Sequence, residues 1–568
     1  MINFKVYNKE GTLQYEVSSK SSYCLEKYHH VAIGQNRKKL AFKYDNTIHN
    51  LVQAPTDISN ETQLYDYLYS SNEGYGILKN DISLSGTFFS DHKTQNYPTI
   101  SAEKNLSGNF SIFPNTTAYT SSADKYIFKS YRPLTLQNLT ISGFTNPYLN
   151  IVDVSSSELT ISGCIFSNND VGVNINVDYS HNTTHIINST FKSLKANKLI
   201  PTPDESSTFK SLKANKLKAN GPRLVQSNKK VKINRRNNGQ TNDTTGEEKW
   251  SPGSAIRYKG EMLYITDSSF VDNSNSSAGG ANYAETYIQT LTLSGENLFS
   301  RNISSLGGAI CIADANEIIV NNGMATLIGN IADVGGAIFS DSPAMSGGGT
   351  YIFSDNCANS GGAIFAYDKM TITGGTYTFS DNCANLNNGG AIFATDISIT
   401  DGSYTFKGNI AKTFGGAIST QNLITTDGSY TFNGNIANTY GGAINTTNLI
   451  TTGGTYTVSD NCANLHDGGA IYAGMLTIKD GSYTFKGNIA KEGGGAIYSY
   501  GTVDISTVKT VRFYGNSSIY NSARGNHILT YDICYNDSSH VLFNMPDCSG
   551  IDGSAVWSTL YGHQICPP

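Results

Sequence analysis

Residues 423–444 read LITTDGSYTFNGNIANTYGGAI, in which short β-forming runs alternate with glycine-marked corners. Leu423 and Thr425 alternate with Ile424, which favours a short strand. Asp427-Gly428 is typical of a turn, because glycine adopts a positive φ without steric cost. Tyr430 and Phe432 lie two residues apart, so they share one face of a second strand.

Two more corners complete this unit. Gly434-Asn435 forms one and Gly441-Gly442 forms the other, after which Ala443-Ile444 opens a third strand. The runs between corners are too short for helices, and β-branched residues dominate them. Three strands and three corners in about 26 residues predict one coil of a parallel β-helix.

The phrase Gly-Gly-Ala-Ile recurs along the chain and marks the period. Its copies begin at residues 307, 335, 361, 389, 415, 441, 468 and 494, and weaker copies begin at Gly253 and Gly279. The nine intervals are 26, 28, 28, 26, 28, 26, 26, 27 and 26 residues. A fixed period of this size is typical of a solenoid, so the fold class is all-β, with three short strands per coil of 26–28 residues.

Stacked coils place equivalent residues above one another, about 4.8 Å apart. We expect a phenylalanine stack and an asparagine ladder, in which each corner asparagine tolerates the left-handed conformation and bonds its own backbone. The predicted stack contains Phe353, Phe379, Phe406, Phe432 and Phe485. The predicted ladder contains Asn356, Asn382, Asn409, Asn435, Asn461, Asn488 and Asn516.

The chain divides into three parts. Residues 1–74 are expected to form strands and an N-terminal cap, 75–516 the solenoid, and 517–568 a C-terminal cap or a truncated continuation. Residues 192–249 interrupt the solenoid with 14 Lys/Arg and five Asp/Glu, a net charge of +9. A long, charged, apolar-poor stretch predicts a disordered insertion. A basic arm for acidic polymers is the alternative, but no aromatic residues interleave with the basic cluster at 229–236 to stack on bases, so no nucleic-acid partner is expected.

A short amphipathic helix is predicted over 58–70. Asn60 is a candidate N-cap with Gln63 three residues later, and apolar residues recur at helical spacing at Leu64, Tyr67 and Leu68. A helix here would cover the open end of the solenoid and protect its terminal strand.

The nine cysteines fall into two groups of interest. Cys357, Cys383 and Cys462 share one repeat position, where sister coils carry isoleucine, so buried thiols are expected. A disulfide between Cys357 and Cys383 on adjacent coils is the alternative. Cys534, Cys548 and Cys566 could staple a terminal cap in an oxidising compartment, and their pairing stays open.

Composition sets few limits on function. The net charge is −5 over 568 residues, and no stretch approaches the length of a membrane helix, so no transmembrane segment is expected. The first residues, MINFKVYNKE, lack the apolar core of a signal peptide.

The sequence assigns no catalytic, cofactor-binding or metal-ligating residue and no cofactor. Polysaccharide chemistry would need clustered carboxylates on one strand face. Asp401, Asp427 and Asp480 recur, but each precedes a glycine, which is a turn preference. His466 and Asp467 adjoin in only one coil.

Gly-Gly-Ala-Ile preceded by Phe-x-x-Asn resembles the repeat of chlamydial-type polymorphic outer membrane proteins. The pairs include Phe353 and Asn356 with Gly361, and similar repeats occur in surface proteins of protist parasites. Leu327 and Val458 depart from the pattern. The resemblance covers about 253–516 and implies a right-handed β-helix exported to a cell surface.

The resemblance also implies a function. We expect a non-enzymatic, extracellular or cell-surface rod, adhesin-like, that binds host cell-surface or matrix components. A lyase or glycoside hydrolase on the same fold is the alternative.

Overall fold

The computed structural model describes most of residues 55–196 and 255–518, together with separate strands before residue 51 and at 533–535 and 541–544. Residues 197–254, and with them most of the predicted insertion, lie outside the described residues, as do Cys548, Cys566 and the side chain of Cys534.

The first fifty residues contain antiparallel strands, and strands were expected within residues 1–74. β1 (Ile2–Tyr7) pairs with β2 (Leu13–Ser19). β3 (Ala32–Asn36), β4 (Lys39–Tyr44) and β5 (Thr47–Asn50) form a second small sheet.

The predicted helix is present as α1 (Glu61–Tyr69). The Asn60 side chain accepts a hydrogen bond from the Gln63 N–H at 2.9 Å, and Gln63 Oε1 accepts one from the Ser59 N–H at 2.7 Å. This reciprocal pair satisfies free donors at the start of the helix. Leu64 and Leu68 are buried in the same apolar core as the coils that follow.

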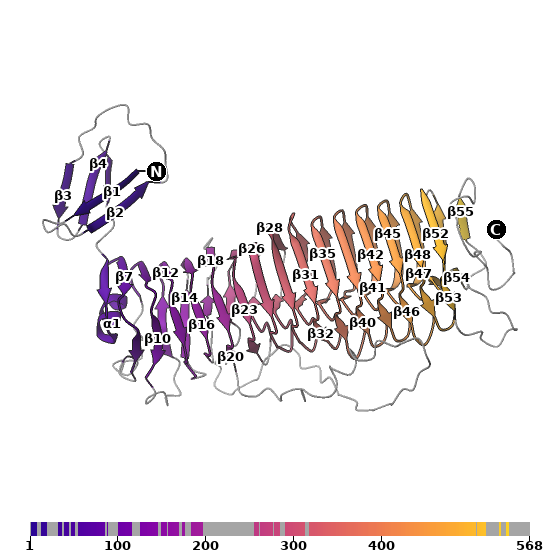
Figure 1. Ribbon diagram of the computed structural model, residues 1–568, viewed down its shortest axis with the longest axis horizontal. Helices are drawn as coiled ribbons and strands as arrows, with labels where there is room; N and C mark the ends of the chain where they lie inside the picture. Colours follow the sequence, from indigo (N-terminus) through magenta and orange to yellow (C-terminus); the bar gives the residue numbers. More distant parts are fainter. Residues whose placement is uncertain are drawn as a thin grey trace.

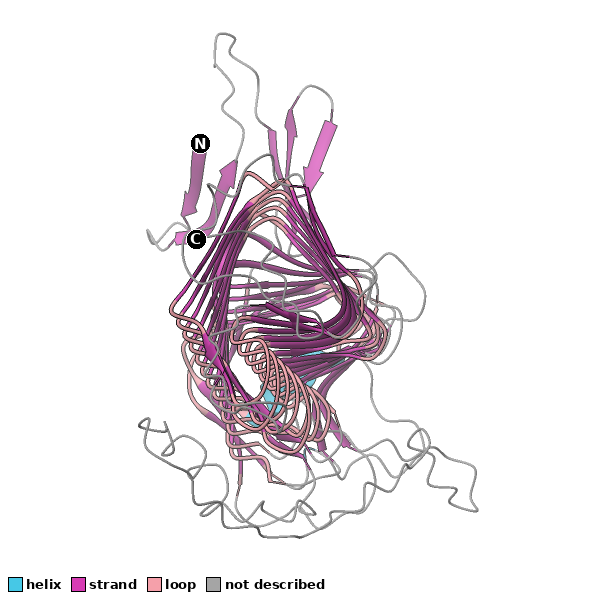
Figure 2. Cartoon of the chain, turned by 90° about the vertical axis from the view of Figure 1, so that its right-hand side faces the viewer, coloured by secondary structure: helices cyan, strands magenta, loops and turns pink. Residues whose placement is uncertain are grey.

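The rest of the described chain is a stack of parallel strands (Figure 1). Parallel pairing begins between β6 (Thr56–Ile58) and β7 (Gly74–Leu78) and ends between β51 (Val503–Ser506) and β55 (Val541–Asn544). It therefore extends on both sides of the range 75–516. Figure 2 looks along the stack, where equivalent strands superpose and the loops gather at the corners.

A coil of the repeat region has three strands when its first strand is long. In the coil that starts at Ile418 these strands are β41 (Ile418–Thr426), β42 (Ser429–Asn433) and β43 (Ile436–Ala437). The prediction of three strands per coil holds there.

Other coils divide the long strand in two. The coil that starts at Ile364 has β33 (Ile364–Ala366), β34 (Lys369–Thr373), β35 (Thr376–Ser380) and β36 (Cys383–Ala384). A bend at Tyr367-Asp368 separates β33 from β34, and the Tyr367 ring points into solvent at 70% exposure. The equivalent stretch of β41 stays extended, with Thr420 Oγ1 donating to the Asn422 carbonyl at 3.1 Å.

The glycine pair forms a corner in every repeat that carries it. At Gly415 φ is +62°, a left-handed conformation that costs glycine nothing. A Cβ on Gly416 would lie 2.1 Å from the Gly442 carbonyl oxygen of the next coil, so only glycine permits this stacking. Ala417 is fully buried and the next strand opens at Ile418, as predicted.

The corner asparagines differ from the prediction in one respect. Asp381 immediately before Asn382, and not Asn382 itself, takes the left-handed conformation, with φ of 53°. The Asn382 side chain bonds neighbouring coils and not its own backbone: Nδ2 donates to Asn409 Oδ1 at 2.9 Å and to the Phe353 carbonyl at 3.0 Å. The expectation of a local asparagine turn is therefore wrong. The reason is that this side chain points inward, where only other coils offer partners.

The ladder itself is confirmed and is longer than predicted. Nine consecutive side-chain links join ten buried asparagines, which are Asn273, Asn302, Asn330, Asn356, Asn382, Asn409, Asn435, Asn461, Asn488 and Asn516.

Aromatic columns fill the interior beside this ladder. Successive rings at Phe353, Phe379, Phe406 and Phe432 lie 4.8 Å apart with planes within 3°, which confirms the predicted stack for these four residues. Phe485 is separated from Phe432 by Val458 and stacks instead on Phe513 at 4.9 Å. A second, tyrosine column runs alongside it at Tyr351, Tyr377, Tyr404, Tyr430, Tyr456 and Tyr483.

The cysteine column holds a disulfide. Cys357 and Cys383 pair directly across β32 (Cys357–Ala358) and β36, with Cα atoms 4.7 Å apart, and their sulfur atoms are bonded. This spacing lies within the range that a disulfide needs. The expectation of free thiols is wrong for this pair, and Cys462 alone of the three keeps a free thiol.

Candidate functional site

The recurring aspartates lie at turns. Asp401, Asp427 and Asp480 have φ of 53°, 50° and 53° and stand in the turn just before the strand that carries the buried tyrosine and phenylalanine. Their carboxylates do not share a strand face, which agrees with the turn preference read from the sequence.

His466 and Asp467 belong to a cluster at another corner, which we call the Tyr440 cluster (Tyr440, His466, Asp467, Tyr472, Glu492). The His466 ring stacks on Tyr440 at 4.9 Å, and Tyr440 contacts Tyr472 at 4.6 Å. His466 Nδ1 lies 3.1 Å from Glu492 Oε2. Both of these polar side chains are about 40% exposed, so the pair faces solvent.

Asp467 is a partly buried carboxyl of this cluster with a raised pKa. Burial, and then the neighbouring charge of Glu492, raise its pKa to about 6, although the Gly493 N–H donates to Oδ1 at 2.7 Å. A carboxyl group that titrates near pH 6 beside a second carboxyl is the kind of group that acid–base chemistry uses. The sequence hinted at the pair His466-Asp467 but gave no sign of Glu492, which comes from the next coil.

Across the described part of the chain, no group of three or more His, Cys, Asp or Glu side chains is arranged to hold a metal ion.

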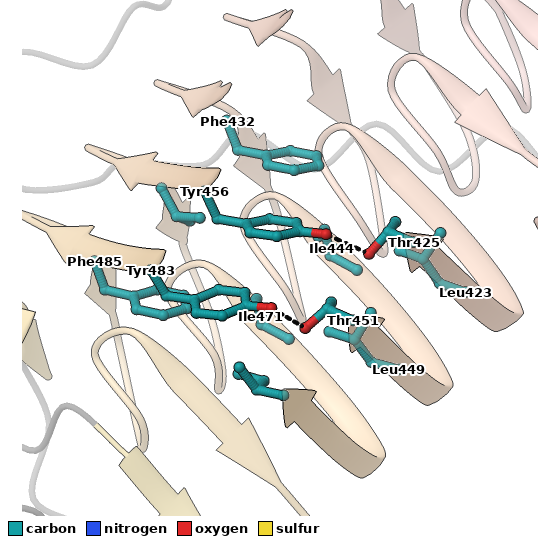
Figure 3. A pocket seen from close by; sticks show the side chains of 12 residues that line it. Leu423, Thr425, Phe432, Ile444, Leu449, Thr451, Tyr456, Ile471, Tyr483 and Phe485 are labelled. Atoms are coloured by element: carbon teal, nitrogen blue, oxygen red, sulfur yellow. Dashed lines mark hydrogen bonds between the residues drawn. The ribbon is translucent and has the colours of Figure 1, made fainter. Parts of the chain in front are cut away.

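An internal cavity lies where the phenylalanine column is interrupted. Val458 takes the column position between Phe432 and Phe485, and the missing ring leaves a cavity of about 20 Å³ (Figure 3). Two hydroxyl pairs border it: Thr425 with Tyr456 at 2.8 Å, and Thr451 with Tyr483 at 3.0 Å. These hydroxyls satisfy each other, so the cavity presents mainly apolar walls and suits no charged ligand.

A buried lysine near the N-terminal end is a residue that sequence reasoning missed. Lys104 is 1% exposed, and its Nζ donates to Ser70 Oγ at 2.8 Å and to the Asn72 carbonyl. The ammonium also lies over the Tyr67 ring at 5.0 Å, and burial lowers its pKa. These contacts tie the end of α1 to β9 (Lys104–Ser107), which is a structural role.

A regular hydroxyl surface covers the outside of one strand in each of five successive coils, namely the strand that carries the inward tyrosine column. β35, β39 (Ser403–Lys407), β42, β45 (Thr455–Ser459) and β48 (Ser482–Lys486) pair in register. In each strand a tyrosine and the residue two positions later point inward, so the alternate residues point outward. That second inward residue is phenylalanine except in β45, where it is Val458. We call these outward residues the Ser/Thr face, and they form two columns: Thr376, Ser403, Ser429, Thr455 and Ser482, and Thr378, Thr405, Thr431, Thr457 and Thr484.

Comparison with known families identifies the repeat. The family model described as the Chlamydia polymorphic membrane protein (Chlamydia_PMP) repeat matches residues 376–395, 403–421 and 482–500. Each match runs from a strand of the Ser/Thr face, through a ladder asparagine, to the Gly-Gly corner. At these three places the chain is similar to the polymorphic membrane protein repeat.

The other comparisons found no relatives. No curated protein and no solved structure matches the chain. Among the residues described, no helix is long and apolar enough to cross a membrane.

Proposed function

We propose that this chain is a right-handed β-helix displayed at a cell surface or secreted, with α1 covering its N-terminal end, and that it acts as an adhesin-like rod for host cell-surface or matrix components. The observation that carries this proposal is the polymorphic membrane protein repeat, matched at three places in the stack. The name of that family refers to membrane proteins, which supports a surface location.

The stacked coils support multivalent binding. The same outward positions recur in each coil, so a rod presents many similar side chains at fixed intervals. Weak contacts at several coils would add to a useful avidity without any deep pocket.

Binding of the purified full chain to cultured epithelial cells and to immobilised matrix proteins tests this function. We expect saturable binding that an excess of unlabelled chain displaces. A chain that binds neither surface would overturn the proposal.

The same preparation also tests the alternative of a polysaccharide-active enzyme, which the raised pKa of Asp467 favours. Release of reducing or unsaturated sugars from polysaccharides, lost in Asp467→Asn, would establish that activity and overturn the non-enzymatic assignment. We expect no such release from wild-type or variant.

A further inference from the structure

The Ser/Thr face is more regular than an ordinary exposed sheet. The phenylalanine rings beneath β35, β39 and β42 are 4.8 Å apart with planes within 3°. The tyrosine rings beneath all five strands are 4.5–5.1 Å apart with planes within 13°. Adjacent strands in most sheets are rotated by about 20–25°. The outward side chains of these five strands therefore lie on a nearly flat lattice.

The chemistry of the face is also uniform. All ten positions carry a hydroxyl, and one whole column is threonine. Threonine has restricted χ1 freedom, so its methyl and hydroxyl groups lose little conformational entropy when a ligand binds. Within the described residues, none of the five threonine hydroxyls has a hydrogen-bond partner, and all five side chains are partly or largely exposed.

This lattice can be compared with that of ordered water. If each oxygen lies about 2.75 Å from four tetrahedral neighbours, oxygens that share a neighbour are about 4.5 Å apart. The same geometry gives hexagonal ice a repeat of about 7.3 Å along its axis. The rings beneath β35, β39 and β42 of the Ser/Thr face repeat every 4.8 Å between coils. Its two columns are separated by two residues of parallel strand, about 6.6 Å.

The mismatch between the two lattices is small over the length of the face. Each row departs by about 0.3 Å from the 4.5 Å water spacing, and the separation of the two columns departs by about 0.7 Å from the 7.3 Å repeat. With the middle row aligned, the outermost of five rows is displaced by about 0.6 Å, which hydrogen bonds to water tolerate. We propose that the Ser/Thr face binds ice, with the threonine hydroxyls joined to lattice water and the methyl groups seated between lattice oxygens.

Other occupants fit the face less well. Its aromatic residues all point inward, so it offers no ring surface on which a sugar could stack. The two columns carry no charge, so they have nothing to attract a polyanion. Lys407 and Lys486 lie only on the next column outward. This inference does not depend on the adhesin proposal.

The experiment uses the full chain in freezing-point hysteresis measurements and fluorescently labelled chain on a single ice crystal. We expect measurable hysteresis and labelling of one family of ice planes. Thr431→Lys, in the middle row, places a long charged side chain on the face and should reduce hysteresis at least fivefold. Thr405→Lys in the neighbouring row should do the same.

Ile424→Lys is the matched control. Ile424 lies in the same coil as Thr431, is 43% exposed and points outward from β41, away from the Ser/Thr face. It should leave hysteresis unchanged, and the circular dichroism spectra of all variants should match that of wild-type. A wild-type chain without hysteresis or ice labelling overturns the proposal, as does an equal loss in Ile424→Lys. Loss of a dimer in Thr431→Lys, for a chain that does not bind ice, would instead make this face a contact between copies.

Discussion

The side-chain amide of Asn382 donates a hydrogen bond to Oδ1 of Asn409, 2.9 Å away in the next coil, and the Asn382 backbone N–H donates to the same oxygen at 3.1 Å. One acceptor thus satisfies two buried donors of its neighbour. Because each asparagine inside the ladder plays both roles, coils are joined by their interior as well as by their strands.

Asn409→Ala should be among the most damaging single substitutions. It removes the acceptor of both Asn382 donors and leaves Asn435 Oδ1 without the Asn409 side chain. Each unsatisfied buried group costs about 1–3 kcal/mol, so we expect a loss of at least about 3 kcal/mol in urea unfolding. Asn445→Ala, at a half-buried position outside the ladder, should lose much less. Equal losses would mean that the ladder contributes nothing specific.

Val458→Phe should stabilise the chain. The new ring would continue the column between Phe432 and Phe485 and fill the cavity of about 20 Å³. At about 24 cal/mol per Å³ of cavity, the gain is about 0.5 kcal/mol. A rise in the urea midpoint checks it, and Phe432→Val should lower the midpoint by creating a second gap. A fall in Val458→Phe would show that the coil cannot admit the larger ring.

Asn282→Ile should also stabilise the chain. Asn282 occupies the isoleucine position of the Gly-Gly-Ala-Ile phrase, is 1% exposed and pairs with Ile256 and Ile310 in adjacent coils. Neither its Oδ1 nor its Nδ2 has a partner among the described residues. Replacing an unsatisfied amide by the apolar side chain of its neighbours should gain about 2 kcal/mol. Ile310→Asn should cost a similar amount, and an unchanged melting temperature in Asn282→Ile would argue that the amide is satisfied.

The disulfide should be visible by mass spectrometry without reduction. Peptides containing Cys357 and Cys383 should be linked, while Cys462 should be recovered as a free thiol. Burial raises the pKa of Cys462 to about 11, so alkylation of the folded chain at pH 8 should be slow. Replacing both linked cysteines by alanine opens a loop of 26 residues and should cost about 3 kcal/mol. Rapid alkylation of Cys357 in the folded, unreduced chain would contradict the bond.

Stability should depend on the protonation of Asp467. Its folded pKa is raised from 3.8 to about 6, so the folded state binds the proton more tightly than the unfolded state. This group therefore favours folding below about pH 4 and loses that contribution as the pH rises through 6. Asp467→Asn should melt higher than wild-type at pH 7, and the difference should shrink towards pH 4. A constant difference across this range would show that Asp467 does not titrate there.

The period of the sequence was enough to predict the stack, the phenylalanine column and the ladder, because each repeats one residue type at one position. Details that depend on a single coil were harder to see. The residue in the left-handed conformation is Asp381 and not Asn382. The Asn382 side chain bonds the neighbouring coil and so does not form the local turn that was predicted. The residues of the Tyr440 cluster come from three coils, and the interval between the Gly-Gly-Ala-Ile copies at 441 and 468 is 27 residues. No single sequence motif therefore includes the whole cluster.

The oxidation state of the cysteines and the regularity of the Ser/Thr face were also not predicted from the sequence. Cys357 and Cys383 occupy the same repeat position, which predicts that they lie side by side in adjacent coils. Other coils carry isoleucine at this position, and this favoured the prediction of buried free thiols. The flatness of the Ser/Thr face is seen in the small angle between successive buried rings beneath it, such as Phe379 and Phe406. The sequence alone does not predict this angle.

The asparagine ladder has a polarity. Every link runs from Nδ2 of one coil to Oδ1 of the coil that follows it in the chain, so nine amide dipoles point the same way along the axis. Such aligned chains polarise one another. If the chain folds coil by coil from its N-terminal side, the asparagine of the last folded coil has not yet donated its Nδ2 hydrogen bond to a following coil. The next coil accepts that bond and presents its own Nδ2 in turn. Addition of coils to this end is therefore favoured, which gives assembly a direction.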